Sequence, residues 1–186
     1  AVKTIVTTDI AKAIAEEYGV KIVDVLTGFK FIGEQIGFLE DKGEEDRYIF
    51  GFEESYGYLA GSYVRDKDAV VASMLICEMA AYYKKQGKTL VDVLDDLANK
   101  FGYYLDSQSS TFFRGADGSD KMNAILEEMR NNPIKEAAGI KVVSTEDFLL
   151  NPPEGFVPSN VLRFNLEDGS FVAIRPSGTE PKCKVY

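Results

Sequence analysis

The sequence contains no histidine among its 186 residues. This absence excludes a histidine general base, a histidine-activated nucleophile and a histidine metal site within these residues. Any proton transfer carried out here must therefore use a carboxylate, lysine, tyrosine or cysteine side chain.

Cysteines and long apolar runs are also scarce. The two cysteines, Cys77 and Cys183, lack the CxxC spacing of a metal or redox site, and two in a chain of this length do not form a disulfide scaffold. We therefore expect a reducing, cytoplasmic location. No run approaches the roughly 18 apolar residues of a membrane span, and residues 2–6 are too few for the apolar part of a signal peptide. We expect no membrane partner.

Basic residues are outnumbered: 21 Lys and Arg face 30 Asp and Glu, giving a net charge of −9. A deficit of this kind excludes the broad basic surface that nucleic-acid binding requires, but it leaves room for a small basic pocket that binds a phosphorylated metabolite. The remaining composition, 45% hydrophobic and 27% charged, is that of an ordinary globular protein.

The chain lacks an initiator Met and stops inside the alternating run 182–186, so we expect a piece of a longer protein.

Strand and helix patterns alternate over the first half and predict an α/β domain in which helices cover a sheet. The apolar spacing predicts strands at 2–7, 20–26 and 48–52, and helices at 9–18, 32–40, 68–85 and 90–101. Residues 53–66 read as one long loop. We expect Asp9 to cap the first helix, and we expect five apolar residues of the third helix to face the core: Val71, Met74, Leu75, Met79 and Tyr82.

The second half, after a boundary near Gly102, reads as α+β. Its patterns predict strands at 103–113, 140–143, 161–165 and 170–175, a helix at 120–130 and a short terminal strand from residue 182. Asp168-Gly169 between two apolar runs predicts a tight hairpin.

The segment 175–181 is the strongest candidate site. Consecutive backbone N–H groups in such a turn can form an anion nest, Ser177 and Thr179 add hydroxyls, and Gly178 permits an unusual backbone angle. Arg175 and Lys182 supply positive charge for a phosphate. A plain hairpin is the alternative interpretation.

Two further loops contain residues suited to chemistry. Glu53, Glu54 and Ser55 follow a predicted strand of the α/β domain, where ligands often bind, and could hold sugar hydroxyls; a solvated loop is the alternative. Asp66 or Asp68 can cap the long helix, or Lys67 can act as an acid or base. Thr27 to Lys30 is a weaker candidate, a turn with one hydroxyl and one cation.

Read in order, four motifs resemble the α-D-phosphohexomutases, most closely their phosphoglucomutase branch. They are Thr27-Gly28-Phe29-Lys30, Phe52-Glu53-Glu54-Ser55-Tyr56-Gly57, Arg65-Asp66-Lys67-Asp68 and Arg175-Pro176-Ser177-Gly178-Thr179. The family has four domains, and the resemblance covers the third and most of the fourth. It implies a three-layer mixed-sheet α/β domain at 1–102, followed at 103–186 by a C-terminally truncated α+β domain of the TATA-box-binding-protein type.

The resemblance also implies roles for individual residues. Glu53 and Ser55 match sugar-hydroxyl ligands, and Lys67 matches an acid/base lysine. Thr27, Gly28, Lys30 and Arg65 belong to motifs that line the substrate cleft. Arg175, Ser177, Gly178 and Thr179 match the phosphate-binding loop, next to Lys182.

Two family motifs are absent from the chain. The Ser-His-Asn nucleophile loop and the Asp-x-Asp-x-Asp loop that holds Mg²⁺ do not occur, and Ala69 stands where the branch often has glycine. The resemblance therefore implies an intramolecular phosphotransferase that acts through a phosphoserine, with Mg²⁺ and glucose 1,6-bisphosphate as cofactors of the full enzyme and none bound by this segment alone. It implies a hexose phosphate substrate and the missing N-terminal domains as partners. Phosphomannomutase or phosphopentomutase activity, a non-catalytic phosphosugar-binding module and a purely structural domain remain alternatives.

Overall fold

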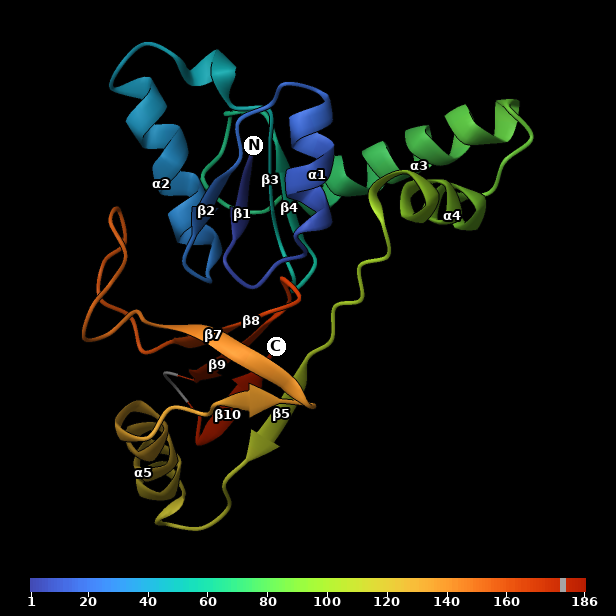
Figure 1. Cartoon of the computed structure of the whole chain (residues 1–186). Helices are drawn as coiled ribbons and strands as arrows, with labels where there is room; N and C mark the ends of the chain where they lie inside the picture. Colours follow the sequence, from blue (N-terminus) through green and yellow to red (C-terminus); the bar gives the residue numbers. More distant parts are fainter. Residues whose placement is uncertain (178–179) are drawn as a thin grey trace. The chain divides into compact units, whose positions relative to one another are not determined.

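A computed structural model describes residues 1–177 and 180–186, and the chain divides into unit 1, residues 1–106, and unit 2, residues 107–186. Figure 1 shows the elements of each unit. Gly102, the predicted boundary, is the C-cap residue of the last helix of unit 1. Unit 1 comprises β1 (Val2–Thr4), α1 (Ile10–Glu17), β2 (Val23–Val25), α2 (Phe29–Glu40), the 3-10 turn η1 (Glu45–Arg47), β3 (Phe50–Glu53), β4 (Gly57–Ala60), α3 (Ala69–Lys85) and α4 (Leu90–Phe101).

The sheet of unit 1 has the strand order β2-β1-β3-β4. β1 runs parallel to both β2 and β3, whereas β4 pairs antiparallel with β3. Because three neighbouring strands are parallel, the loops that follow them leave from the same edge of the sheet.

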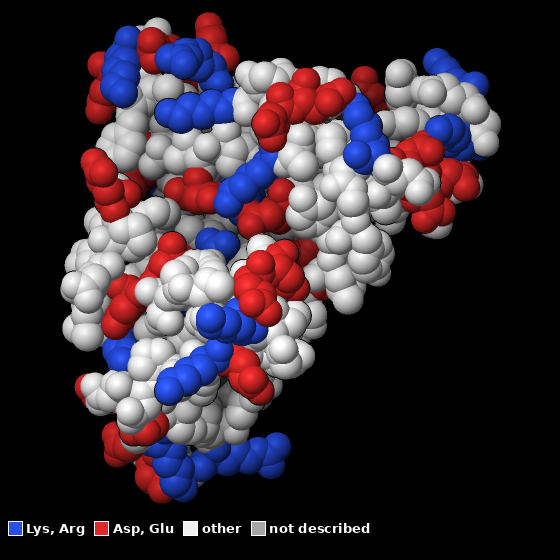
Figure 2. Space-filling model, viewed as in Figure 1, with Lys and Arg blue, Asp and Glu red and all other residues white. Residues whose placement is uncertain are grey.

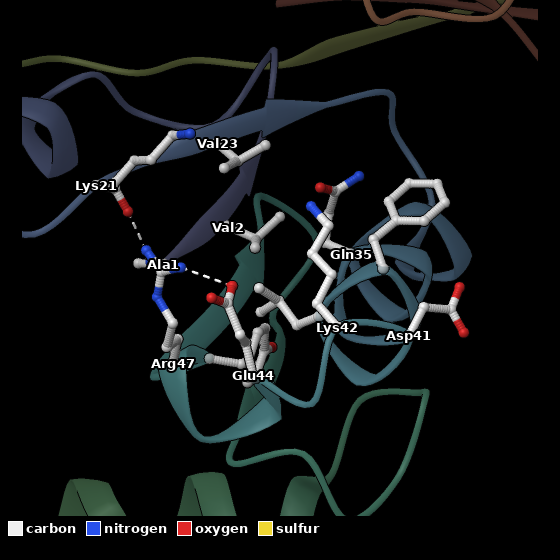
Figure 3. Close-up of a pocket in the computed structure, with 12 residues that line it drawn as sticks. Ala1, Val2, Lys21, Val23, Gln35, Asp41, Lys42, Glu44 and Arg47 are labelled. Carbon is white, nitrogen blue, oxygen red and sulfur yellow. Dashed lines mark hydrogen bonds and ion pairs between the residues drawn. The ribbon is translucent and has the colours of Figure 1, made fainter.

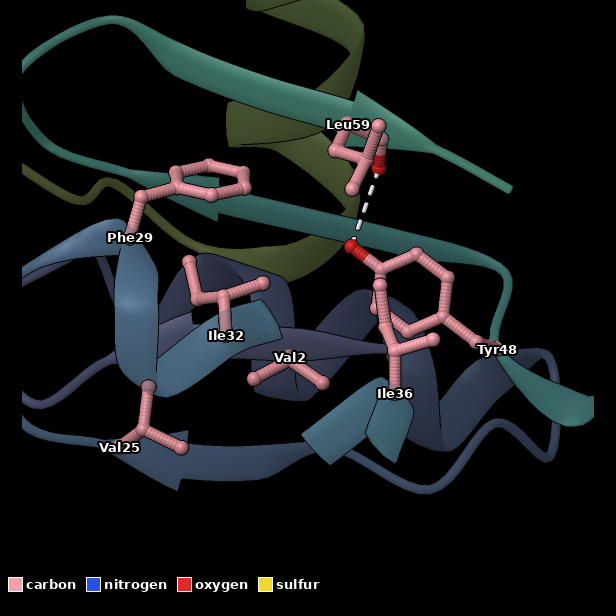
Figure 4. Close-up of a cluster of buried hydrophobic side chains, with 7 residues drawn as sticks. All are labelled: Val2, Val25, Phe29, Ile32, Ile36, Tyr48 and Leu59. Carbon is pink, nitrogen blue, oxygen red and sulfur yellow. Dashed lines mark hydrogen bonds between the residues drawn. The ribbon is translucent and has the colours of Figure 1, made fainter. Parts of the chain in front are cut away.

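One face of this sheet packs against α2. Val2 joins six other buried side chains in a cluster, drawn in Figure 4, that α2 covers: Val25, Phe29, Ile32, Ile36, Tyr48 and Leu59. The Tyr48 hydroxyl donates a hydrogen bond to the carbonyl oxygen of Leu59 at 3.2 Å, so the one polar group in the cluster is satisfied. Burying one aliphatic or aromatic side chain of this kind contributes roughly 1.5–3 kcal/mol, so the cluster fixes α2 on the sheet.

The opposite face of the sheet carries charge and lies under α1. Lys3 is next to Val2 and therefore points the other way, toward Asp24, its register partner on β2, with the Lys3 Nζ and the Asp24 Oδ1 3.2 Å apart. Lys12 of α1 contacts the same carboxylate at 2.8 Å. Helices thus cover both faces of the sheet, which confirms the predicted α/β class.

Asp9 does not cap α1 as predicted. Its side chain makes no capping hydrogen bond, and its carboxylate instead contacts Lys3 and Lys12, each at 3.0 Å. The buried ammonium group of Lys3 is the stronger attraction, since an unpaired buried charge would cost several kcal/mol.

The helix α2 begins at Phe29, three residues earlier than the sequence predicts, so Lys30 lies in its first turn. Gly33 allows a close approach on its buried side: a Cβ atom there would lie 2.3 Å from the carbonyl oxygen of Arg65. The segment that precedes α3 therefore runs directly over α2.

The prediction of a single loop over residues 53–66 is wrong, because β4 forms within it. Gly57 pairs opposite Glu53, and Ala60 pairs opposite Phe50. The Gly and Tyr content of this stretch is that of a flexible loop, and only pairing with β3 makes it a strand.

The long helices α3 and α4 begin where the sequence predicts. The Asp68 carboxylate caps α3 by accepting hydrogen bonds from the backbone N–H groups of Val70 and Val71, and Thr89 and Asp92 form a capping box at α4. The predicted core face of α3 is wrong, however. No residue of α3 is buried, and Met74 and Tyr82 are 58% and 62% exposed, because α3 packs mainly against β4 and α4 rather than on the face of the sheet.

Unit 2 is a six-stranded antiparallel sheet with one helix packed on it, which confirms its α+β class. The sheet order is β5-β10-β9-β8-β7-β6. The apolar side of α5, represented by Met122 and Leu126, packs against Phe164, Ile174 and Cys183 of the strands. The elements are β5 (Ser109–Phe112), α5 (Gly118–Asn131), β6 (Glu136–Ala137), β7 (Ile140–Asp147), β8 (Leu162–Leu166), β9 (Phe171–Pro176) and β10 (Lys182–Val185).

The predicted strands of unit 2 are confirmed in number, except that β6 is additional. The Asp168-Gly169 hairpin joins β8 to β9, with Gly169 at φ 87°. The strand expected over 103–113 is shorter, since only Ser109–Phe112 pairs with β10, and β7 continues beyond residue 143 because it pairs with β8 as far as Asp147.

Candidate functional site

In unit 1, the candidate residues gather at the edge of the sheet where the parallel strands end. Glu53 is the last residue of β3, Ser55 follows it in the turn to β4, and Thr27 and Gly28 follow β2. Gly28, at φ 119°, is the N-cap residue of α2, so the positive end of that helix also lies at this edge. This is the edge at which open α/β sheets bind ligands.

Glu53 and Lys67 form an ion pair at this edge. The Nζ atom of Lys67 donates a hydrogen bond of 2.8 Å to Oε1 of Glu53. The Glu53 side chain is only 5% exposed, whereas that of Lys67 is 52% exposed, so a buried acceptor faces a donor that solvent or a ligand can reach. The hydrogen bond to Glu53 raises the pKa of Lys67 above its usual value, and Lys67 is therefore an ammonium ion at neutral pH.

Gly57 confines the Glu53 carboxylate. The two residues are opposite each other in the β3–β4 pair, and a Cβ atom on residue 57 would lie 2.6 Å from Oε1 of Glu53. Glycine at this position leaves the space that the carboxylate occupies. Between them, the turn carries Ser55, which is exposed, and Tyr56, which has φ 62°.

Two of the predicted substrate residues make other contacts. The Arg65 guanidinium forms an ion pair with Glu40 at the end of α2 and donates a 2.7 Å hydrogen bond to the carbonyl oxygen of Ser62. The Lys30 ammonium lies 4.8 Å from the centre of the Phe31 ring. The ion pair with Glu40 joins the Arg65 loop to α2, and a substrate role for Lys30 and Arg65 stays a prediction.

In unit 2, the candidate phosphate loop joins β9 to β10. Arg175 pairs with Lys184 in the register of these strands. The backbone N–H of Ser177 donates to the carbonyl oxygen of Lys182 at 2.7 Å, and the Ser177 hydroxyl accepts from the backbone N–H of Glu180 at 3.3 Å. The turn is thus closed at its base by main-chain and hydroxyl contacts. Gly178 and Thr179, also predicted for this site, lie outside the described residues.

Lys182 already has a partner within this loop. Its Nζ atom lies 2.6 Å from Oε2 of Glu180 and 5.2 Å from the centre of the Phe112 ring. Its side chain is 19% exposed. A phosphate that used this cation would therefore compete with the Glu180 carboxylate.

Comparison with known families gives the order of domains that the sequence motifs imply, the third domain followed by the fourth. Residues 1–101 match the family model described as phosphoglucomutase/phosphomannomutase, alpha/beta/alpha domain III, and residues 122–186 match the model of the C-terminal domain of that family. The chain belongs to the phosphoglucomutase/phosphomannomutase family.

Individual relatives support this assignment. Phosphoglucomutase from Staphylococcus aureus strain bovine RF122 / ET3-1 is 40% identical over 199 aligned residues, and that from Staphylococcus haemolyticus strain JCSC1435 is 38% identical over 195. Each alignment covers 100% of this chain but 35% of the relative, so the chain spans about a third of the length of these proteins.

Solved structures share the fold. The open form of the Paramecium exocytosis-sensitive phosphoprotein pp63/parafusin, a phosphoglucomutase, superimposes with a TM-score of 0.67 at 24% identity over 99% of this chain and 31% of that one. A putative phosphomannomutase from Thermus thermophilus gives 0.60 at 18% identity, again over 99% and 31%.

Unit 1 also contains a hollow that lies away from the predicted site at Glu53 and Lys67. It measures about 430 Å³ and lies at the start of β1 and β2, with Lys21, Gln35, Lys42 and Arg47 among its lining residues (Figure 3). Arg47 is paired with Glu44 at 2.7 Å. None of the sequence-predicted site residues lines it.

The described acids do not fit the Mg²⁺ that the family resemblance implies. Within residues 1–177 and 180–186, no three carboxylate or thiol side chains gather as a metal site requires.

Over the same residues, every helix is too short or too polar to cross a bilayer. Acidic and basic side chains are interspersed among other residues on the face shown in Figure 2.

Sequence reasoning missed one cluster beside the site. Lys3, Thr4 and Thr7 are buried, and Thr4 contacts Glu54 next to the Glu53–Lys67 pair. The available signal was a single charged residue in the middle of each of two short apolar strands, Lys3 in β1 and Asp24 in β2, which the alternation pattern places on the same face.

Proposed function

We propose that this chain supplies sugar-hydroxyl and phosphate recognition within a phosphoglucomutase that interconverts glucose 1-phosphate and glucose 6-phosphate. The observation that carries the proposal is the Glu53–Lys67 pair at the carboxyl edge of the parallel strands, in a chain 40% identical over its whole length to a phosphoglucomutase. A buried carboxylate that can accept hydrogen bonds beside an accessible ammonium group suits a ligand with hydroxyls and negative charge.

In the proposed reaction, a phosphoserine in a part of the protein outside this chain transfers its phosphoryl group to a hydroxyl of the sugar phosphate. The product, glucose 1,6-bisphosphate, then returns its other phosphoryl group to the serine. Positioning and electrostatic stabilisation dominate such transfers. Both can be supplied by a segment that lacks the nucleophile, and the Mg²⁺ that the resemblance implies would likewise be held outside this chain.

Most of the candidate residues have a part in this scheme. Glu53 accepts hydrogen bonds from the sugar hydroxyls, and Ser55 donates or accepts one. Arg175, Ser177, Gly178 and Thr179 hold the phosphate that is not reacting, with Lys182 beside them.

Lys67 handles the proton of the reacting hydroxyl. When sugar hydroxyls compete for the Glu53 carboxylate, the hydrogen bond that raises the pKa of Lys67 weakens. Its pKa then moves down toward the ordinary lysine value, so the ammonium group becomes a better proton donor and the amine is formed more easily.

The test uses the complete protein that contains this chain, assayed with glucose 1-phosphate, mannose 1-phosphate and ribose 1-phosphate. We expect the highest kcat/KM with glucose 1-phosphate. We expect Glu53→Gln to lower it about 10- to 100-fold, as expected for hydrogen bonds to a charged group, and Glu127→Gln on α5 to leave it unchanged. Preference for another sugar, or equal activity of the two variants, would contradict the proposal.

The chain alone is expected to be inactive, because the serine lies elsewhere. Mutase turnover by residues 1–186 without the remaining domains would refute this part of the proposal. Binding of glucose 1,6-bisphosphate by a protein without mutase activity would instead support the non-catalytic phosphosugar-binding module.

We also propose a cytoplasmic location. Cys77 is exposed and Cys183 is buried, and both are free thiols in the structure, as expected in a reducing compartment. Fractionation of source cells, with the protein detected by antibody, tests this directly, and recovery outside the cytoplasmic fraction would contradict it.

A further inference from the structure

Glu54 is connected to the interior of unit 1 by two threonine hydroxyls. The Oγ1 atom of Thr4 donates a hydrogen bond of 3.0 Å to Oε2 of Glu54, and it lies 2.8 Å from Oγ1 of Thr7. Thr4 is fully buried at the end of β1, and Thr7 is 5% exposed. Glu54 is the turn residue between Glu53 and Ser55.

The direction of these hydrogen bonds follows from counting protons. A threonine hydroxyl has one proton to donate. Because the proton of Thr4 goes to Glu54, the contact between the two hydroxyls requires that Thr7 donates to Thr4. The Thr7 proton then points to the Thr4 oxygen and the Thr4 proton to the Glu54 carboxylate, an arrangement in which each hydrogen bond polarises the next.

The far end of this chain of hydroxyls is fixed by Lys3. Its Nζ atom donates to the carbonyl oxygen of Thr7 at 2.8 Å and forms ion pairs with Asp9 and Asp24 at 3.0 and 3.2 Å. The Lys3 side chain is completely buried. The loop after β1 is therefore held by a charge that cannot leave its partners without a large cost.

The turn that contains Glu54 requires a stabilising contact. Tyr56 adopts φ 62°, a left-handed conformation that costs a residue other than glycine about 1 kcal/mol. Its side chain is 86% exposed and so does little to hold the turn. The hydrogen bond from Thr4 to Glu54 joins the turn to the buried network.

We propose that Glu54 is a positioning residue for sugar recognition. Held by Thr4 and Thr7, it fixes the turn so that Glu53 and Ser55 face the sugar hydroxyls together. This inference rests on the proposed function, because it concerns how the same two residues meet their ligand. Glu54 itself does not contact the sugar.

The test measures kcat and KM for glucose 1-phosphate in the complete protein. Thr4→Val keeps the shape of the side chain but removes the donor, and Thr4→Ser restores a hydroxyl. We expect Thr4→Val and Glu54→Ala each to raise KM about 10-fold with little change in kcat, and Thr4→Ser to remain within about 2-fold of wild type. Thr8→Val, in the same loop but without a contact to Glu54, is the matched control.

A purely structural role for Glu54 predicts a different result. Loss of folded protein would lower the apparent kcat in proportion and leave KM unchanged. The double variant Thr4→Val/Glu54→Ala should raise KM no further than Glu54→Ala alone, since both changes break one contact. Multiplied effects, or a fall in kcat at constant KM, would overturn the proposal.

Glu53→Gln separates this inference from the function on which it rests. If Glu53→Gln impairs activity while Thr4→Val and Glu54→Ala leave KM unchanged, the positioning role is wrong and the proposed function stands. If Glu53→Gln has no effect, the proposed function itself fails. Should Thr4→Val not fold, Glu54→Ala decides alone, because residue 54 lies in a turn outside the hydrophobic cluster.

Discussion

The Nζ atom of Lys67 and the Oε1 atom of Glu53 lie 2.8 Å apart, although the two residues are 14 positions apart in the sequence. The strand β4 makes this contact possible by returning along β3, after which the backbone N–H of Asp68 donates a hydrogen bond of 2.8 Å to the carbonyl oxygen of Tyr58. Lys67, which precedes the helix cap Asp68, is thereby brought back to Glu53 at the end of β3.

The first prediction concerns the pH dependence of catalysis. The Glu53 carboxylate raises the pKa of Lys67, so Glu53→Gln should lower that pKa. In the complete protein, the limb of the kcat/KM profile that Lys67 sets should therefore move to lower pH in Glu53→Gln. Profiles measured from about pH 6 to 11 for both proteins check this.

Glu17→Gln is the control for that experiment. Glu17 also pairs with a lysine, Lys100, at 2.6 Å and raises its pKa, but this pair lies between α1 and α4. Its removal should leave the profile in place. An unchanged profile in Glu53→Gln, or a shift to higher pH, would show that Lys67 does not set the limb.

The second prediction concerns Gly57. A methyl group on this residue would lie 2.6 Å from the Glu53 carboxylate oxygen, so Gly57→Ala should displace the carboxylate and lower kcat/KM at least 10-fold. Gly37→Ala on α2 is the control, because its methyl group would meet nothing within 4 Å and should raise the free energy of unfolding by about 0.5–1 kcal/mol. Full activity of Gly57→Ala would contradict the confinement of Glu53.

The third prediction concerns the buried lysine. Lys3→Met should lower the free energy of unfolding by about 3 kcal/mol, because it leaves Asp9 and Asp24 without one of their two cationic partners. Lys12, at 3.0 and 2.8 Å from these carboxylates, limits the loss. Denaturant titration of the complete protein measures it, with Lys85→Met at the exposed end of α3 as the control. Equal stability of the two variants would contradict the prediction.

The fourth prediction is that the same cluster makes the free energy of unfolding depend on pH in the acid range. Burial alone would raise the pKa of Asp9, but hydrogen bonds and charge from Lys12 and Lys3 outweigh it, and the pKa lies below the ordinary 3.8. The resulting stabilisation is present above that value and is lost as the pH falls through the pKa of the folded state. The stability difference between wild type and Asp9→Asn should therefore be constant above about pH 5 and shrink below about pH 4. A difference independent of pH would contradict this assignment.

The fifth prediction concerns the candidate phosphate loop. Because Glu180 competes for Lys182, Glu180→Gln should tighten the binding of glucose 1,6-bisphosphate about 2- to 5-fold, the range of an exposed ion pair, whereas Arg175→Ala should weaken it. Isothermal titration of the complete protein measures both. Glu167→Gln, an exposed acid in the β8–β9 hairpin, is the control. Weaker binding by Glu180→Gln would contradict the competition.

Local signals in the sequence predicted much of this fold. Asp68, one of the two predicted caps, caps α3, α4 begins at Leu90 as predicted, and Asp168-Gly169 forms the expected hairpin, because each depends on a few neighbouring residues. The candidate residues Glu53, Ser55 and Lys67 were likewise found from short motifs.

Features that depend on distant partners were not predicted. Gly57 and its neighbours become a strand only by pairing with β3, and the apolar pattern of α3 gives no indication of which surface covers it. Neither Thr4 nor Lys3 could be assigned a contact, because their partners come from separate loops. The hydrophobic period and the residue propensities of a segment show which secondary structures it can form. Its pairing and packing with distant segments decide which one it adopts.

The close approach at Gly33 has a consequence for sequence variation. A residue that touches no ligand determines how near the segment of Arg65 and Lys67 can come to α2, since any side chain there would press on the Arg65 carbonyl group. In a saturation mutagenesis screen for growth on a sugar phosphate, position 33 should tolerate as few replacements as Glu53.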